Sequence, residues 1–84
     1  MNYEIVNELK GVKISCYADV EEIDTNEILV KRTKQVDDFF NLIDLEGGFE
    51  LCFYTEYGEL IRTVSNARFS GGNEYITIYN CCND

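Results

Sequence analysis

The chain of 84 residues contains no histidine, no proline and no tryptophan, and its sixteen aspartates and glutamates outnumber seven lysines and arginines. Without histidine it lacks the commonest general base, the usual partner of a serine or cysteine nucleophile, and the commonest nitrogen ligand for zinc or iron. The P-loop, G-x-G-x-x-G and G-x-S-x-G motifs are also missing. We therefore expect a protein that is not an enzyme, with no catalytic residue and no cofactor.

Long apolar runs are missing too. No segment approaches the roughly 20 apolar residues that a membrane-spanning helix needs, and the sequence MNYEIVNELKGVK at the N-terminus lacks the pattern of a secretory signal. These features predict a cytoplasmic protein with no membrane contact. In that compartment its four cysteines should be reduced, and their positions do not match the pairs of zinc sites, which are separated by about two to four residues. No metal site is predicted from Cys16, Cys52, Cys81 and Cys82.

The net charge of −9 is spread along the chain rather than gathered in a tail. Residues 1–42 hold nine acidic and five basic side chains, and residues 43–84 hold seven acidic and two basic ones. Direct binding to nucleic acid or to an anionic membrane would work against this charge, because such binding normally draws on lysine and arginine. A basic protein partner would instead be attracted.

With no proline, linker or repeat to mark a boundary, residues 1–84 are expected to form a single acidic α+β domain. Residues 2–10 place apolar side chains at helical spacing and are followed by Gly11, which predicts a short helix. Residues 12–18 alternate in polarity and predict a strand whose inner face carries Val12, Ile14, Cys16 and Ala18. Residues 27–33 are rich in apolar and β-branched side chains and predict a second strand.

The strongest helical pattern covers residues 34–45, where Val36, Phe39, Phe40 and Ile43 recur on one face. Residues 49–55, 59–69 and 74–80 are separated by turn residues and predict a three-stranded meander. The order α-β-β-α-β-β-β describes an antiparallel sheet with a central amphipathic helix packed on one face. The expected core consists of Phe39, Phe40, Ile43, Phe49, Leu51, Phe53, Ile76 and Ile78.

Residues 19–27, DVEEIDTNE, hold five carboxylates in the expected connection between two strands. An EF-hand loop places oxygen ligands at alternate positions of its first half and glycine at its apex. Counted from Asp19, the third ligand position holds Ile23 and the apex holds Asp24. The spacing therefore excludes a calcium loop of this kind.

Carboxylates repeated along a strand or a helix lie about 5 to 7 Å apart, which is comparable with the phosphates of a nucleic-acid strand. Surface acids also serve solubility alone, so both interpretations stay open. The carboxylates expected to bind a partner are Asp19, Glu21, Glu22, Asp24 and Glu27 in the acidic stretch, and Asp37, Asp38 and Asp44 on the polar face of the helix. They form one surface only if the two groups lie side by side.

Three tyrosines are expected on the sheet face that points away from the helix. Tyr75 and Tyr79 alternate with apolar residues of the last strand, and Tyr54 is out of phase with Phe53. Tyrosine is enriched at the energetic centres of protein interfaces, whereas stacking of RNA bases would need a basic surround that the chain lacks. We include Tyr54, Tyr75 and Tyr79 among the expected partner-binding residues.

These observations favour a small acidic inhibitor that docks onto a basic, nucleic-acid-binding surface of a partner such as a nuclease. In size, acidity and lack of catalytic motifs the chain is similar to the anti-restriction and anti-CRISPR proteins of phages and mobile elements, as a class. The alternative is a structural or regulatory homodimer that associates through the tyrosine-bearing sheet face. A metal-binding protein with an irregular carboxylate site is the third interpretation.

Overall fold

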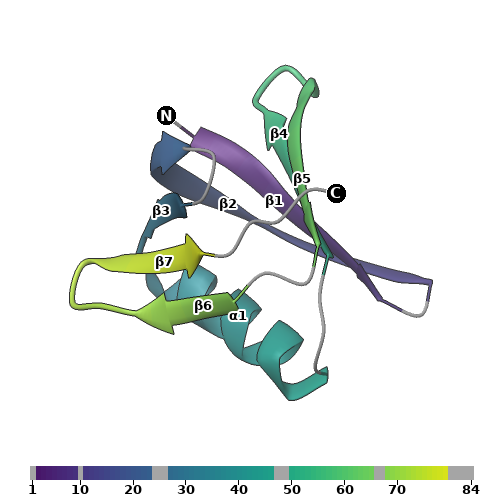
Figure 1. Cartoon of the computed structure of the whole chain (residues 1–84). Coiled ribbons are helices and arrows are strands. Elements are labelled where there is room, and N and C mark those ends of the chain that lie inside the picture. The colour runs from purple at the N-terminus through teal and green to yellow at the C-terminus, as the bar shows by residue number, and fades with distance from the viewer. Residues whose placement is uncertain (1, 10, 24–26, 47–49, 66–67, 80–84) are drawn as a thin grey trace.

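The computed structural model describes residues 2–9, 11–23, 27–46, 50–65 and 68–79 (Figure 1). In chain order the elements are β1 (Asn2–Leu9), β2 (Val12–Ile23), β3 (Glu27–Lys31), α1 (Lys34–Glu46), β4 (Glu50–Thr55), β5 (Leu60–Ser65), β6 (Arg68–Gly71) and β7 (Tyr75–Tyr79). All seven strands belong to one sheet, in the order β5-β4-β1-β2-β3-β7-β6, and every neighbouring pair is antiparallel. The expected class, a small α+β domain built on an antiparallel sheet, is confirmed, and α1 is the helix that the structure describes.

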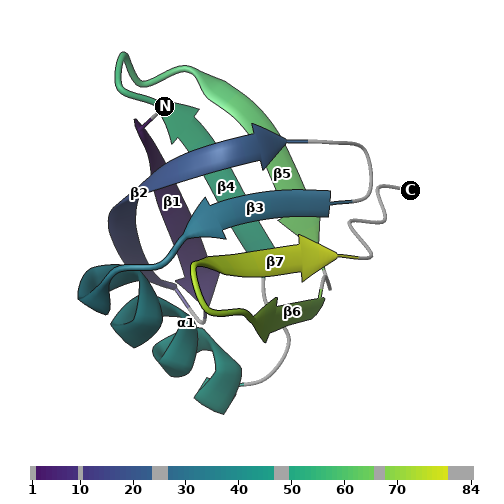
Figure 2. The same ribbon diagram turned by 90° about the vertical axis from the view of Figure 1, so that its left-hand side faces the viewer.

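The long strand β2 joins the two halves of the sheet. Its first eight residues pair with β1, and its last residues pair with β3 with an irregularity between Val20 and Glu22. A bulge of this kind bends a strand and increases its twist. In Figure 2, β2, β3 and β7 accordingly cross in front of β1, β4 and β5, and α1 lies across one end of the curved sheet. The strands β5 and β6, at opposite ends of the sheet order, are separated by only residues 66 and 67.

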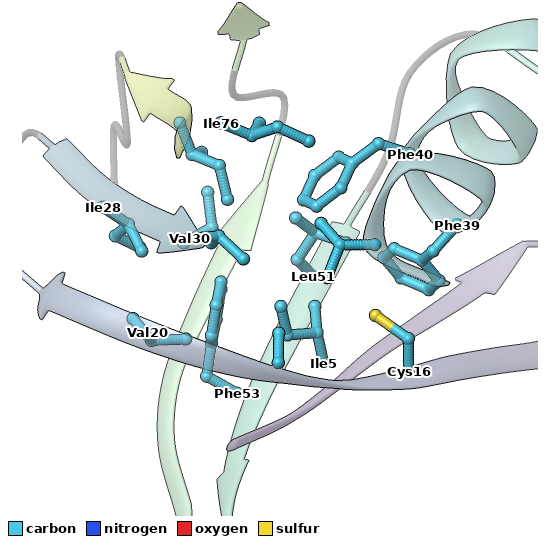
Figure 3. Packing of buried hydrophobic residues seen from close by; sticks show 14 of the residues in the cluster. Ile5, Cys16, Val20, Ile28, Val30, Phe39, Phe40, Leu51, Phe53 and Ile76 are labelled. Atoms are coloured by element: carbon cyan, nitrogen blue, oxygen red, sulfur yellow. The ribbon is translucent and has the colours of Figure 1, made fainter. Parts of the chain in front are cut away.

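The core fills the inner, concave face of this sheet. Side chains from both halves of the sheet and from α1 point toward one another there (Figure 3). The helix contributes its predicted apolar face, and Phe40 packs edge-on to Phe39 and also contacts Phe69 of β6. The predicted core residues are buried wherever the structure describes them, namely Phe39, Phe40, Ile43, Leu51, Phe53, Ile76 and Ile78, whereas Phe49 lies outside the described residues.

The start of α1 is fixed by its own sequence. The Thr33 hydroxyl accepts a hydrogen bond from the Val36 amide at 3.2 Å, which satisfies one of the amides that a helix leaves without a partner. The Asp37 amide donates to the Thr33 carbonyl at 2.9 Å, the first turn of the helix. The prediction of a helix beginning at Lys34 is confirmed.

The predicted helix over residues 2–10 is wrong, because residues 2–9 form β1 in the middle of the sheet. Ile5 and Asn7 both face the core, and the Asn7 side-chain amide donates to the Glu50 carbonyl at 3.0 Å. A buried asparagine at an inward position hides the alternation typical of a strand, since its polarity imitates an outward position. Gly11, with φ of 80°, makes the turn into β2 rather than ending a helix.

Two other predictions need correction. The acidic residues 19–23 extend strand β2 instead of belonging to a connection. The single strand expected over residues 59–69 is divided into β5 and β6, which lie at opposite edges of the sheet. The expected meander of three neighbouring strands is therefore wrong, since β4 pairs with β1 and β5 lies beyond β4, while β7 pairs with β3 and β6 lies beyond β7.

Candidate protein-interaction face

The outer, convex face of β2, β1, β4 and β5 carries a row of large side chains across the strands. The register places Glu4 of β1 opposite Tyr17 of β2 on one side and opposite Tyr54 of β4 on the other, and pairs Tyr54 with Leu60 of β5. We call Tyr17, Glu4, Tyr54 and Leu60 the tyrosine row. Tyr17, Glu4 and Tyr54 alternate with buried neighbours such as Ile5 and Phe53, so their side chains point away from the core, and Leu60 is exposed opposite Tyr54.

The tyrosine row is accessible and has a carboxylate near its centre. Tyr17 is 67% exposed and Leu60 is 51% exposed, while Glu4 and Tyr54 are half-buried. Within the described residues the Glu4 carboxylate makes no hydrogen bond and no ion pair. The arrangement is an exposed aromatic and apolar surface in which Glu4 lies on the strand between those of two tyrosines.

The turn between β4 and β5 extends this surface. The Thr55 hydroxyl accepts hydrogen bonds from the amides of Tyr57 and Glu59, both at 3.2 Å, and the Gly58 amide donates to the Thr55 carbonyl at 2.9 Å. Gly58 adopts a φ of 83°, which suits glycine far better than other residues. The turn is thus held by several hydrogen bonds, and it exposes 89% of Tyr57 between two glutamates.

The outer face of these four strands is predominantly acidic. Where β1, β2, β4 and β5 pair with one another, the charged outward positions include Glu4, Glu8, Asp19, Glu50 and Lys13. Lys13 lies 3.9 Å from Glu8, and both side chains are well exposed, so this pair is screened by water. Asp19 interacts with the N-terminal ammonium, which lowers the pKa of its carboxyl, whereas Glu4 has no basic partner among the described residues, so a cationic surface approaching this face still meets a net negative field.

The predicted carboxylates divide into two separate groups. Asp19, Glu21 and Glu22 lie near the end of β2 and Glu27 begins β3, whereas Asp24 lies outside the described residues. The helix that carries Asp37, Asp38 and Asp44 starts beyond the opposite end of β3. A strand of five residues separates the groups by roughly 16 Å. The structure therefore does not bring them together as one continuous row.

Two helix carboxylates are engaged in pairs of their own. Arg32 binds both carboxylate oxygens of Asp37, at 2.9 and 3.1 Å, and also donates to the Gly72 carbonyl. These hydrogen bonds hold the pKa of Asp37 below its usual value. Lys34 lies 3.2 Å from Asp38 one turn along the helix. Arg32 thereby joins α1 to the turn between β6 and β7, which makes a structural role the better explanation for Asp37.

The three predicted tyrosines also separate. Tyr54 lies in the tyrosine row, but Tyr75 and Tyr79 lie on β7, and three strands stand between β4 and β7. Tyr75 is paired in register with Lys31, and Tyr79 with Glu27 and Arg68. Both are half-buried on the outer face, as expected, in a setting that contains more basic side chains than the tyrosine row.

Sites for other kinds of chemistry are sparse in the described part of the chain. No three His, Cys, Asp or Glu side chains are grouped there in a way that could hold a metal ion. Cys16 is buried, as its alternation predicted, and burial raises the pKa of its thiol to about 11.

A cleft of about 520 Å³ between α1 and β2 is lined by residues that include Ile14, Phe39 and Leu42. The helix α1, with 13 residues, is too short to cross a bilayer, and the described segments include no other helix.

Comparison of the chain with protein-family models, with curated proteins and with solved structures finds no match. The candidate face therefore depends on its own geometry and chemistry.

The sequence contained part of the signal for this face. Alternation over residues 12–18 already placed Tyr17 on the polar side of its strand, together with Lys13 and Ser15. Glu4 was not recognised as a residue of this face, because residues 2–10 were incorrectly predicted to form a helix. Its position between two tyrosines depends on the pairing of β1 with both β2 and β4, which no local pattern encodes.

Proposed function

We propose that the protein is a non-enzymatic interaction protein that docks onto a basic surface of a partner protein. The tyrosine row, with its uncompensated Glu4, is the observation that carries this proposal. Large aromatic side chains supply most of the binding energy at many interfaces, and the acidic surround attracts a cationic partner and speeds its approach. We further propose that the basic surface is a nucleic-acid-binding site, which the bound inhibitor blocks.

The charge of the whole chain supports this choice of partner. With a net charge of −9, the protein repels nucleic acid and other strongly acidic surfaces at long range. Glu21, further along β2 than Tyr17, adds exposed negative charge. A nucleic-acid-binding site of another protein is an extended basic surface, and it offers the complementary charge.

A homodimer remains the second candidate, since the tyrosine row would suit a twofold contact in which each copy covers the other. The charge argues against it, because two copies bring the same acidic face together. Sedimentation velocity at two protein concentrations distinguishes the two candidates. A monomer at both concentrations is expected, and a concentration-dependent dimer that dissociates on replacing Tyr54 by alanine would favour the homodimer instead.

The proposal is tested by affinity purification of partners from the native host with tagged protein, followed by binding measurements on the purified partner at several salt concentrations. Tyr17→Ala and Tyr54→Ala are each expected to weaken binding by more than about 1 kcal/mol, as truncation of a central interface aromatic does. Tyr75→Ala and Tyr79→Ala are the matched controls, because they remove the same side chain from the other half of the outer face.

Affinity is expected to fall as salt rises, and this protein should compete with the partner's nucleic acid for the basic site of the partner. An affinity that does not change with salt would contradict the electrostatic part of the proposal. Equal losses from the Tyr54 and Tyr79 variants would contradict the assignment of the face.

A further inference from the structure

We infer that Tyr17, Glu4 and Tyr54 form a binding site for one arginine side chain of the basic partner. This inference rests on the proposed function and assigns the centre of the proposed interface. Its basis is the juxtaposition of a half-buried carboxylate with two tyrosines, one on each neighbouring strand. The cleft beside α1 carries no comparable inference, since nothing around it identifies what would cover it.

The spacing of the three strands suits a cation. Adjacent strands lie about 4.8 Å apart, so a positive group placed over Glu4 has a tyrosine about 5 Å away on either side. A cation within about 6 Å of an aromatic ring is attracted by the charge distribution of that ring. The same position also allows contact with the Glu4 carboxylate, so attraction from two rings and from one full negative charge converges on one point.

No basic side chain of the described residues neutralises Glu4. Lys13, the basic outward residue on these four strands, lies beside Glu8 at the other end of β1. An incoming guanidinium would give the Glu4 carboxylate charge-assisted hydrogen bonds that the described residues do not supply.

Arginine fits better than lysine. Its guanidinium group is flat and weakly hydrated, stacks against aromatic rings and can bind both oxygens of a carboxylate, whereas an ammonium group is compact and strongly hydrated. Tyr17 and Tyr54 offer ring surfaces on both sides of a carboxylate, which is the combination that favours a guanidinium. The partner residue inserted between the rings is therefore an arginine.

The test uses the whole protein, labelled with nitrogen-15, and the capped peptide acetyl-Gly-Arg-Gly-amide as the probe. Two further peptides replace arginine by lysine and by citrulline, which has nearly the same shape as arginine but no charge. Chemical-shift changes are expected to be concentrated at Glu4, Tyr17, Tyr54 and their cross-strand neighbours. Binding should weaken in the order arginine, lysine, citrulline, with no detectable binding of the citrulline peptide.

The substitution Glu4→Gln keeps the size of the side chain and removes its charge, and it should weaken binding of the arginine peptide by about fivefold, the upper range for an accessible ion pair. Glu27→Gln is the matched control, because Glu27 is also an outward glutamate paired with a tyrosine, Tyr79, on the neighbouring strand. This control should leave the affinity unchanged. The dispersion of the amide spectrum shows whether each variant remains folded.

Equal binding of the arginine and lysine peptides, equal effects of the two glutamine substitutions, or shift changes spread over all exposed carboxylates would each overturn the inference. The peptide result is independent of the proposed function. If the arginine peptide binds at Glu4 but no basic partner docks through the tyrosine row, the site stands and the proposed function fails. If a partner needs Tyr54 but binds the Glu4→Gln variant normally, the function stands and the arginine site is wrong.

Discussion

Replacing Phe40 by alanine should remove the main link between α1 and the part of the sheet that contains β6. Phe40 is 1% exposed, and its ring centre lies 5.4 Å from that of Phe39 and 5.0 Å from that of Phe69. A buried phenylalanine replaced by alanine costs about 3 to 5 kcal/mol, which is a large part of the roughly 5 to 15 kcal/mol that stabilises a domain. For a chain of this size the melting temperature should fall by at least about 12 °C.

Urea unfolding followed by circular dichroism measures this loss, and Leu42→Ala is the control on the same helix. Leu42 is 54% exposed, so its truncation should change stability by less than about 0.5 kcal/mol. If Phe40→Ala leaves too little folded protein to measure, Phe40→Leu combined with Phe69→Leu in a double-mutant cycle should give a coupling of about 0.5 to 1.5 kcal/mol. Equal costs for Phe40 and Leu42, or no coupling between the two rings, would refute the orientation of α1.

Three further predictions concern single positions. Because Arg32 lowers the pKa of Asp37 in the folded state, the stability that this pair supplies is present above the ordinary carboxyl pKa and is lost as the pH falls through the lowered value. Asp37→Asn should therefore reduce stability at neutral pH and flatten its decline below about pH 4, as measured by thermal melts across pH. Gly58→Ala should cost about 1 to 2 kcal/mol from backbone conformation alone, since no atom lies within 4 Å of the added methyl group, and an unchanged melting temperature would contradict the positive φ. The thiol of Cys16 should resist alkylation at pH 8, detected by mass spectrometry of digested protein, and should become reactive only on unfolding, because burial raises its pKa to about 11.

The helix and the core were predictable because their signals are local. Four apolar side chains at helical spacing and a threonine before Lys34 determine both the inner face of α1 and its first residue. Leu51 and Phe53 alternate cleanly with outward neighbours, so one buried face follows directly from the sequence. Such patterns depend on residues a few positions apart, which any single sequence displays.

The first strand and the division of the sheet were not predictable in this way. Asn7 is buried because the Glu50 carbonyl, 43 residues further along the chain, accepts its hydrogen bond, and no pattern near Asn7 indicates such a partner. Similarly, nothing in residues 59–69 distinguishes one long strand from two strands at opposite edges of the sheet. The choice depends on which strand edges are already occupied by β1 and β3.

For the candidate face, only the residue types and their outward orientation were predictable. Excess negative charge and outward tyrosines follow from composition and alternation, and Tyr54 was identified correctly as an outward residue. The grouping was not predictable, since Tyr17, Glu4 and Tyr54 meet through two strand pairings. The sequence also could not show that the acidic helix face and the end of β2 are separate surfaces. They are separated by the length of β3, which no local pattern reveals.

The two-residue passage from β5 to β6 has a consequence for how the chain folds. Three peptide steps span at most about 11 Å, so the outermost strands of the sheet must approach each other near Ser65 and Arg68. The curved sheet forms only when β1 pairs with β4 and β3 pairs with β7. These pairings place Ile5 opposite Phe53 and Ile28 opposite Ile78, residues about 50 positions apart in the chain. Folding is then limited by closing these long loops and should take milliseconds to seconds. During synthesis, β3 keeps an unpaired edge until the last strand emerges from the ribosome, so the nascent chain depends on β7 to become resistant to aggregation.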